Sequence, residues 1–287
     1  MSTQTDSDMD YETMNRASWN ERAPAHVTSP DYEISDHIHD AGFIGHVVQF
    51  DRPYLGDITG LNCIHLQCHI GTDTLGLARL GAASVTGLDF SVTAITAARD
   101  LAAQTVGSGG EKLKFVEASL FDALDILPPG TFDLVYISIG SLCFMPKIKD
   151  WAKIVTGLLK PGGRVFLREF HPVLWSLDRK SPQDLIISTP YFEREEPTIL
   201  EAPKSYADLT SQDFALTKFA VYNHGIGEVI QALLEEGMKL TLLKEHQSAP
   251  LLGMLRQLMV KEKGEYSLED RPWRLPLSYT VHAVKEQ

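Results

Sequence analysis

The feature that most constrains the fold is an alternation of short apolar runs and helical runs between residues 62 and 170. The runs of strand character cover 63–67, 84–88, 113–117, 132–137 and 164–170, and those of helical character cover 73–80, 91–105 and 151–159. Strands separated by helices imply right-handed crossovers and a parallel sheet with helices on both faces. The alternation therefore predicts an α/β fold.

Four parts of the chain follow from where this alternation begins and ends. Residues 1–50 form a polar N-terminal arm and helical cover, with a helix over 11–22, and residues 51–170 form the core. Residues 171–223 break the alternation with Pro, charged and aromatic residues, and an insertion of this kind is typical of a lid. Residues 224–287 return to the core with a helix at 227–236 and strands at 238–246 and 278–284.

Composition and charge exclude several classes of partner. The 287 residues are 44% hydrophobic and carry a net charge of -12, with no run of Lys or Arg longer than two. The sequence therefore lacks the clustered basic residues that bind the phosphate backbone of a nucleic acid. No apolar stretch approaches the roughly 20 residues of a membrane span, and the N-terminus lacks a signal pattern. We expect a cytoplasmic protein with a small-molecule partner, neither nucleic acid nor membrane, and no oligomeric state is indicated.

The cysteine and histidine residues form no recognisable pattern of metal ligands or disulfide partners. The chain has three cysteines, Cys63, Cys68 and Cys143. Without a CxxC pattern they are interpreted as reduced structural thiols. His37, His39 and His46 lie near one another in the sequence, but their spacing matches no recognised ligand pattern. We therefore predict no metal.

A strand-to-helix turn over residues 65–74 has the properties of a nucleoside site. Gly71 lets the main chain pass close to a ligand, beside a helix N-terminus that favours a carboxylate or phosphate. Asp89 ends the next strand, where it can accept hydrogen bonds from both hydroxyls of a ribose. Two structural alternatives remain open: Gly71 serves the turn alone, and Asp89 caps the helix that begins near Ser91.

Two later segments extend this pattern. FDLVY at 132–136 forms a strand, and LLKPGGRV at 158–165 ends a helix with a Pro-Gly-Gly turn and begins another strand. In this order of motifs the sequence resembles the Rossmann-like, class I S-adenosylmethionine-dependent methyltransferases. The resemblance implies a three-layer sandwich with a mostly parallel seven-stranded sheet, whose last strand is antiparallel, and S-adenosyl-L-methionine as cofactor.

The resemblance also implies a set of cofactor-binding residues. They are Tyr11, Trp19, Arg22, Gln67, Cys68, Gly71, Asp89, Phe90, Ser91, Ser119, Leu120 and Ser138. The first motif departs from the family because Gln67, Cys68 and His69 replace its acidic residue and glycine, although Gln67 can still accept from the methionine amino group. Ser119 stands where an Asp often holds adenine. Leu120 packs on the adenine ring or in the core, and Trp19 closes over the methyl group or packs at the domain edge.

A narrower resemblance concerns the acceptor. LQCHIGTDTLGLARLGA followed by VTGLDFS, together with NRASWNERAP at 15–24 and NHGIGE at 223–228, is similar to a group of actinobacterial and fungal small-molecule methyltransferases. This group includes enzymes that S-methylate the dithiol of gliotoxin-type metabolites. The resemblance implies thiol methylation in secondary metabolism.

Methyl transfer from a sulfonium is an in-line displacement, so the protein mainly aligns the nucleophile and excludes water. His171 and His224 are predicted proton acceptors, with substrate shaping as their alternative role. The predicted acceptor site is apolar and aromatic, although its residues also suit a core. It consists of Phe43, Tyr54, Cys143, Trp175, Tyr191 and Trp273.

The sequence therefore predicts an enzyme, an S-adenosylmethionine-dependent methyltransferase of a small molecule. S-methylation of a thiol is preferred, with O- or N-methylation of a metabolite or quinone as the alternative. A nucleoside-binding module without catalysis is a second alternative, because the first motif is degenerate. A nicotinamide-linked reductase fits less well, since a pyrophosphate needs a fuller glycine turn than Gly71 alone supplies.

Overall fold

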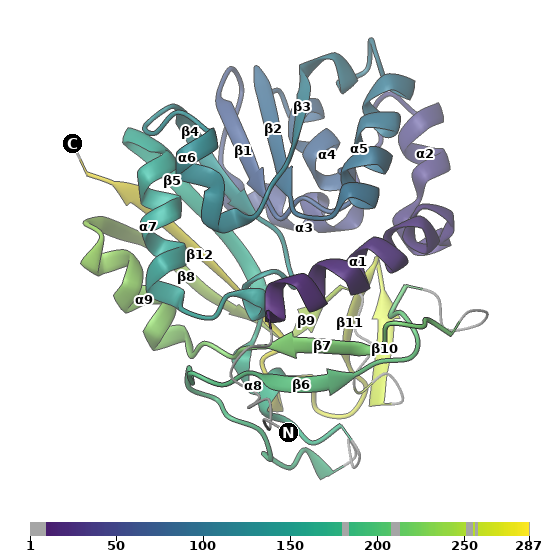
Figure 1. Ribbon diagram of the computed structural model, residues 1–287, viewed down its shortest axis with the longest axis vertical. Helices are drawn as coiled ribbons and strands as arrows, with labels where there is room; N and C mark the ends of the chain where they lie inside the picture. The colour runs from purple at the N-terminus through teal and green to yellow at the C-terminus, as the bar shows by residue number, and fades with distance from the viewer. Residues whose placement is uncertain (1–9, 180–183, 208–212, 251–254, 256–257, 287) are drawn as a thin grey trace, which may run out of the picture.

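A twisted seven-stranded sheet forms the centre of the computed structural model, which describes residues 10–179, 184–207, 213–250, 255 and 258–286 (Figure 1). The strand order is β3-β2-β1-β4-β5-β12-β8. In chain order these strands are β1 (Asn62–Leu66), β2 (Ser84–Asp89), β3 (Leu113–Glu117), β4 (Phe132–Ile137), β5 (Leu159–Phe170), β8 (Met238–His246) and β12 (Ser278–Lys285). β1 to β5 are parallel, and β12 runs antiparallel to β5 and β8. The predicted Rossmann-like architecture is confirmed.

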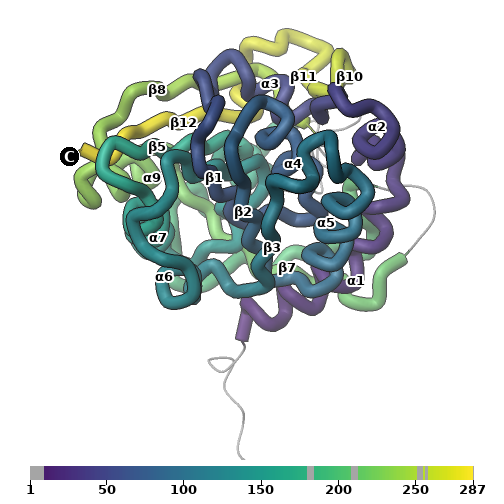
Figure 2. The backbone as a smooth tube through the Cα atoms, turned by 90° about the horizontal axis from the view of Figure 1, so that it is seen from above, coloured from purple at the N-terminus to yellow at the C-terminus, as the bar shows by residue number. Residues whose placement is uncertain are grey.

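Helices cover both faces of this sheet (Figure 2). The helices of the core are α3 (His46–Leu55), α4 (Thr72–Arg79), α5 (Val92–Gln104), α6 (Ala123–Ile126), α7 (Ile148–Leu158) and α9 (Ile226–Glu235). Successive side chains of a strand point to opposite faces. Accordingly Cys63 packs with the α3 and α4 cluster, while the next residue, Ile64, packs with the α7 and α9 cluster. Among the described residues, no helix has the length and apolar character needed to cross a membrane.

The N-terminal helix α1 (Tyr11–Thr28) packs against a two-stranded hairpin, β6 (Thr198–Glu201) and β7 (Lys218–Val221) (Figures 1 and 2). Polar side chains of α1 form hydrogen bonds with the main chain of this hairpin. Asn15 exchanges two hydrogen bonds of 2.9 Å with the main chain of Ala220, and Ser18 donates to the carbonyl of Lys218. These polar contacts explain why a segment with few apolar residues packs on the hairpin with one buried face.

The remaining elements are short. They are α2 (Ile34–His39), α8 (Pro172–Ser176), β9 (Ser248–Ala249), β10 (Met259–Glu262) and β11 (Glu265–Leu268), with the short 3-10 helices η2 (Pro30–Tyr32), η3 (Gly110–Lys112), η4 (Leu120–Asp122), η5 (Leu142–Phe144) and η8 (Pro272–Arg274). β9 to β11 follow β8 and precede β12 in the chain, and they form a separate three-stranded sheet. This small sheet lies within the predicted 224–287 core segment, so that segment contains an insertion of its own.

Candidate functional site

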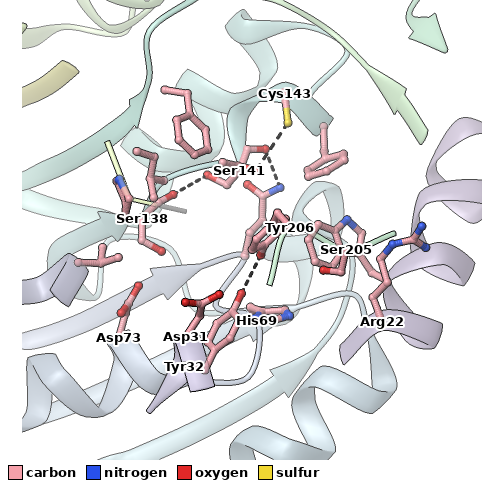
Figure 3. Close-up of a pocket in the computed structure, with 18 of the residues that line it drawn as sticks. Arg22, Asp31, Tyr32, His69, Asp73, Ser138, Ser141, Cys143, Ser205 and Tyr206 are labelled. Carbon is pink, nitrogen blue, oxygen red and sulfur yellow. Dashed lines mark hydrogen bonds between the residues drawn. The ribbon is translucent and has the colours of Figure 1, made fainter. Parts of the chain in front are cut away.

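A cavity of about 610 Å³ lies at the carboxyl ends of β1, β2 and β4, and residues of α1, η2 and the β6–β7 region line its other side. Ligands of open α/β sheets bind at the carboxyl ends of the strands. Figure 3 shows residues from both sides, with Asp73 and Ser138 of the core facing Tyr32 and Tyr206. The topology therefore brings the sheet edge and the cover together around one space.

The loop between β1 and α4 has an unusual main-chain conformation. Gln67, His69 and Gly71 have φ values of 54°, 51° and 82°. A left-handed conformation costs a residue with a side chain about 1–2 kcal/mol, and such strain is concentrated at functional sites. The Gln67 Nε2 donates to the carbonyl of Ser141 over 3.2 Å, whereas its Oε1 is buried without a partner among the described residues. This orphaned acceptor fits the amino group of the predicted cofactor.

Gly71 has a packing role that differs from the close ligand approach proposed from the sequence. A Cβ atom on this residue would lie 2.9 Å from both Ala98 Cβ and Phe115 Cζ. The Gly71 Cβ direction thus points into the interior, where α5 and β3 meet. Its left-handed φ and this crowding both require a glycine.

Asp89 lies at the end of β2, beside the same loop. Its Oδ2 accepts from the main-chain N–H of His69 and its Oδ1 from that of Ser91, both over 2.9 Å. A carboxylate can accept about four hydrogen bonds, so acceptor capacity remains for a ribose hydroxyl. Burial raises the pKa of Asp89 to about 6. These residues fit a nucleoside with a free amino group.

A buried histidine that was not predicted from the sequence supports the residues of the site. The His65 ring lies 2.9 Å from Thr74 Oγ1 through Nδ1 and 2.9 Å from Ser138 Oγ through Nε2. Burial lowers the pKa of His65 to about 3, so the ring is neutral. It joins the ends of β1 and β4 to the first turn of α4.

Aromatic side chains form the cover of the cavity. Trp19 contacts five rings edge-on at centroid distances of 5.4 to 6.5 Å: His26, His69, Phe144, Tyr206 and Phe219. The Tyr32 and Tyr206 hydroxyls are 2.7 Å apart. Trp19 was predicted from the sequence, whereas Tyr32 and Tyr206 were not, because they carry no local motif.

A chain of hydrogen bonds links three segments of the site. His26 Nδ1 lies 3.0 Å from His69 Nε2, and His26 Nε2 lies 2.6 Å from Ser205 Oγ. Burial lowers the pKa of His69 to about 3 and that of His26 well below its usual value. Both rings are therefore neutral at physiological pH and connect the β1–α4 loop, α1 and the segment after β6.

A second group of cavity-lining side chains is largely apolar, and its members contact one another. We call the cavity-lining side chains Cys143, Phe170, Leu174, Trp175, Leu177 and Arg179 the acceptor chamber. The Phe170 and Trp175 rings are 6.2 Å apart and nearly perpendicular. The carboxylate of Glu169 accepts from the main-chain N–H groups of Gly140, Ser141 and Leu142, over 2.7 to 2.9 Å. Glu169 thereby fixes the loop that carries Cys143.

The three cysteines are free and buried. Burial raises the pKa of the Cys63 thiol to about 12 and those of Cys68 and Cys143 well above the usual value. The thiols are therefore protonated at physiological pH. In the described part of the chain, no three His, Cys, Asp or Glu side chains are grouped as ligands for a metal.

Several predicted site residues line the cavity. They are Trp19, Arg22, Gln67, Cys68, Asp89, Phe90, Ser138, Cys143 and Trp175. Arg22 differs from the others because its guanidinium donates to the carbonyls of Ser18, Leu216 and Ala202, and it points away from the other labelled side chains in Figure 3.

Other residues proposed for the cofactor have different contacts. Tyr11 bonds to Glu196, Ser91 caps α5, Ser119 caps η4, and Leu120 lies in the core. Ser119 and Leu120 are outside the lining of the cavity. Their roles in holding the adenine stay predictions.

The remaining predicted acceptor and catalytic residues also lie outside that lining. Phe43 contacts His37, Tyr54 contacts Phe50 and His246, Tyr191 contacts Phe192, and Trp273 is 70% exposed. His171 Nε2 pairs with Glu245 over 2.8 Å. His224 lies between the carbonyl of Met145 at 2.8 Å and the carboxylate of Glu193 at 3.0 Å. The catalytic role of both histidines stays a prediction.

The sheet order, the carboxylate at the end of β2 and the orphaned acceptor after β1 define the class I S-adenosylmethionine-dependent methyltransferase fold. Residues 64–165 match the family model described as a methyltransferase domain. This match covers the strands and loops that form the cofactor side of the cavity. The match bears out the predicted methyltransferase class, and the site geometry is consistent with the predicted cofactor, S-adenosyl-L-methionine.

Solved structures with the same fold come from several organisms. A protein of Listeria monocytogenes, assigned as an S-adenosylmethionine-dependent methyltransferase, is 18% identical with a TM-score of 0.59, over 84% of this chain and 97% of that one. A methyltransferase of Methanosarcina mazei is 21% identical with a TM-score of 0.54, over 83% and 97%.

A third solved structure is the magnesium protoporphyrin IX methyltransferase of Synechocystis with bound SAH. It is 17% identical with a TM-score of 0.53, over 96% of this chain and 100% of that one. At such identities the likeness concerns the fold. No curated protein matches the chain.

Proposed function

We propose that the protein methylates a small, largely apolar molecule, and that the preferred acceptor is a thiol of a secondary metabolite such as a gliotoxin-type dithiol. The observation that carries this proposal is a single cavity with two chemically different parts. One part contains Asp89 and Gln67, and the other contains Leu174 and Trp175. Both reactants of a group transfer need to meet in one space shielded from water.

The cofactor side of the cavity has groups for each end of S-adenosylmethionine. Asp89 would accept from the ribose hydroxyls, and Gln67 Oε1 from the methionine amino group. When bound, this cofactor supplies an activated methyl group on a positively charged sulfur. Aromatic faces are favourable neighbours for such a charge, and Trp19 and Tyr32 line the same space.

The state of His69 favours a thiol acceptor over an alcohol. This ring lines the cavity, but its Nε2 is engaged by His26 and its pKa is about 3, so it is a poor proton acceptor. A thiol has a pKa near 8.5 and forms a nucleophilic thiolate without a strong base. His171 and His224 remain proposed proton acceptors for the alternative O- and N-methylation.

Transfer of a tritiated methyl group to acceptors with one carbon skeleton tests the proposal. Thiophenol, phenol and aniline differ in the nucleophilic atom while the ring stays constant. We expect the thiol to be labelled fastest. Label on phenol or aniline alone would support O- or N-methylation, with His171→Ala and His224→Ala then identifying the base. Cofactor binding without labelling of any acceptor would support the non-catalytic module.

A thermal shift comparison addresses the nicotinamide-linked alternative. A ligand that binds the folded state raises its melting temperature. We expect S-adenosylhomocysteine to raise it and NADH to leave it unchanged. The reverse result would assign the cavity to a dinucleotide.

A further inference from the structure

Arg179 places one positive charge in the otherwise apolar acceptor chamber. It lies three residues beyond the end of α8 and lines the cavity. Its guanidinium carbon is 5.3 Å from the centre of the Trp175 ring. Arg179 is exposed to solvent overall, and partial desolvation lowers its pKa without removing its charge at physiological pH.

The charge of Arg179 is available to a ligand, unlike those of two other cations that line the cavity. Arg22 donates to three main-chain carbonyls, and Lys261 pairs with Asp31 at 3.5 Å. Within the described ranges, Arg179 has neither a hydrogen bond nor an ion pair, and the acid next to it in sequence, Asp178, has an interaction of its own. Arg179 is exposed, so its guanidinium is accessible to an anionic ligand that enters the cavity.

The walls beside Arg179 suit an aromatic or aliphatic body. Trp175 contacts both the guanidinium and the Phe170 ring, and Leu174 and Leu177 belong to one apolar cluster with Leu255. Arg has a planar fork of donors that matches a carboxylate with two parallel hydrogen bonds. The net charge of -12 repels anions at long range, so a local cation is needed to retain one.

We propose that Arg179 is a specificity-determining residue, and that the methyl acceptor is an apolar molecule with a carboxylate that pairs with its guanidinium. The proposal rests on the proposed function, because it names the acceptor class of the same cavity. Arg179 binds the acceptor at a distance from the methyl group, with Trp175 against the apolar body. Loss of this contact weakens acceptor binding without changing the transfer step.

Binding of two matched probes tests the proposal without turnover. 2-Naphthoate and 2-naphthamide share a ring system and differ in charge, and calorimetry with the S-adenosylhomocysteine complex measures both affinities. We expect the wild-type protein to bind the naphthoate at least about tenfold more tightly, as a charge-assisted hydrogen bond implies. Arg179→Gln should remove this preference, while Arg179→Lys retains part of it. Equal binding of both probes to the wild-type protein would overturn the proposal.

Lys204 supplies a matched control, because it is another cavity-lining cation without an ion pair among the described residues. We expect Lys204→Gln to keep the preference for naphthoate. Loss of the preference in Lys204→Gln but not in Arg179→Gln would overturn the assignment to Arg179. 2-Naphthyl phosphate, bound by the wild-type protein more tightly than naphthoate, would also overturn the choice of a carboxylate.

A kinetic comparison separates this proposal from the proposed function. With 3-mercaptobenzoate as acceptor, Arg179→Gln should raise KM at least about tenfold and leave kcat unchanged, whereas 3-mercaptobenzamide should show no difference. A fall in kcat with KM unchanged would contradict a binding role. If no acceptor is methylated, the proposed function fails, and the probe affinities still decide the role of Arg179.

Discussion

The main-chain N–H of His69 donates to Oδ2 of Asp89 over 2.9 Å, so the carboxylate that ends β2 also holds the loop that follows β1. Its other oxygen accepts from Ser91 at the start of α5. One side chain therefore fixes two segments of the candidate site, and Asp89 also lines the cavity. The ribose contact proposed for Asp89 would therefore depend on the same side chain that holds these two segments.

Replacing Asp89 by Ala should weaken binding of S-adenosylhomocysteine. A hydrogen bond to a charged group contributes about 1.5–3 kcal/mol, so we expect Kd to rise at least about tenfold in calorimetry. Asp133→Ala is a matched control, because this residue lies at the amino end of β4, away from the cavity at the carboxyl ends, and pairs with Lys160. Unchanged affinity in Asp89→Ala would contradict the ribose assignment.

Cofactor affinity should depend on pH through the same carboxyl group. Burial raises the pKa of Asp89 to about 6, and protonation below that pH removes acceptor capacity for the ribose. We therefore expect affinity for S-adenosylhomocysteine to increase as pH rises through this value, by about threefold or more between pH 5 and pH 7. Asp89→Asn should abolish this dependence.

A second carboxyl group provides the control for this pH dependence. Burial also raises the pKa of Asp73 to about 6, and Asp73 lines the same cavity. Asp73→Asn should keep the increase with pH. If the increase disappears in Asp73→Asn and persists in Asp89→Asn, the titration belongs to Asp73.

The strands of the fold were predictable because their signals are local. The predicted ranges 113–117, 132–137 and 238–246 coincide with β3, β4 and β8. β5 begins at Leu159, five residues before the predicted start, because Leu159 pairs with Phe132 across an irregularity in the register. β9 to β11 escaped prediction because they are short and partly exposed, so they lack a clear apolar alternation.

The candidate site divides in the same way. Gln67 and Asp89 were identifiable because each directly follows or ends a strand of a recognisable motif. Tyr32 and Tyr206 are 174 residues apart, and their contact depends on α1 docking against the β6–β7 hairpin. This docking uses the main chain of the hairpin, as the Asn15 contact with Ala220 shows, so it leaves no side-chain pattern in the hairpin sequence.

Trp19→Ala should reduce methyl transfer if the aromatic cover excludes water from the reacting atoms. We expect at least about a tenfold fall in kcat/KM, because loss of water exclusion and alignment acts on the transition state. Trp19→Phe should retain part of the activity. Trp273→Ala is the matched control, since that ring is 70% exposed and lies outside the cavity lining. Equal rates for Trp19→Ala and the wild type would show that the aromatic cover does not contribute to methyl transfer.

Glu169→Gln should lower both stability and acceptor binding. The buried carboxylate accepts from three main-chain N–H groups of residues 140–142, and an amide has only one acceptor oxygen. At least one buried N–H group then loses its partner, so we expect the free energy of unfolding to fall by about 1–3 kcal/mol in urea titrations. KM for the acceptor should rise because this loop carries Cys143 into the acceptor chamber. Glu201→Gln, on the hairpin, should change neither quantity, and an unaltered Glu169→Gln protein would show that the loop keeps its shape without the carboxylate.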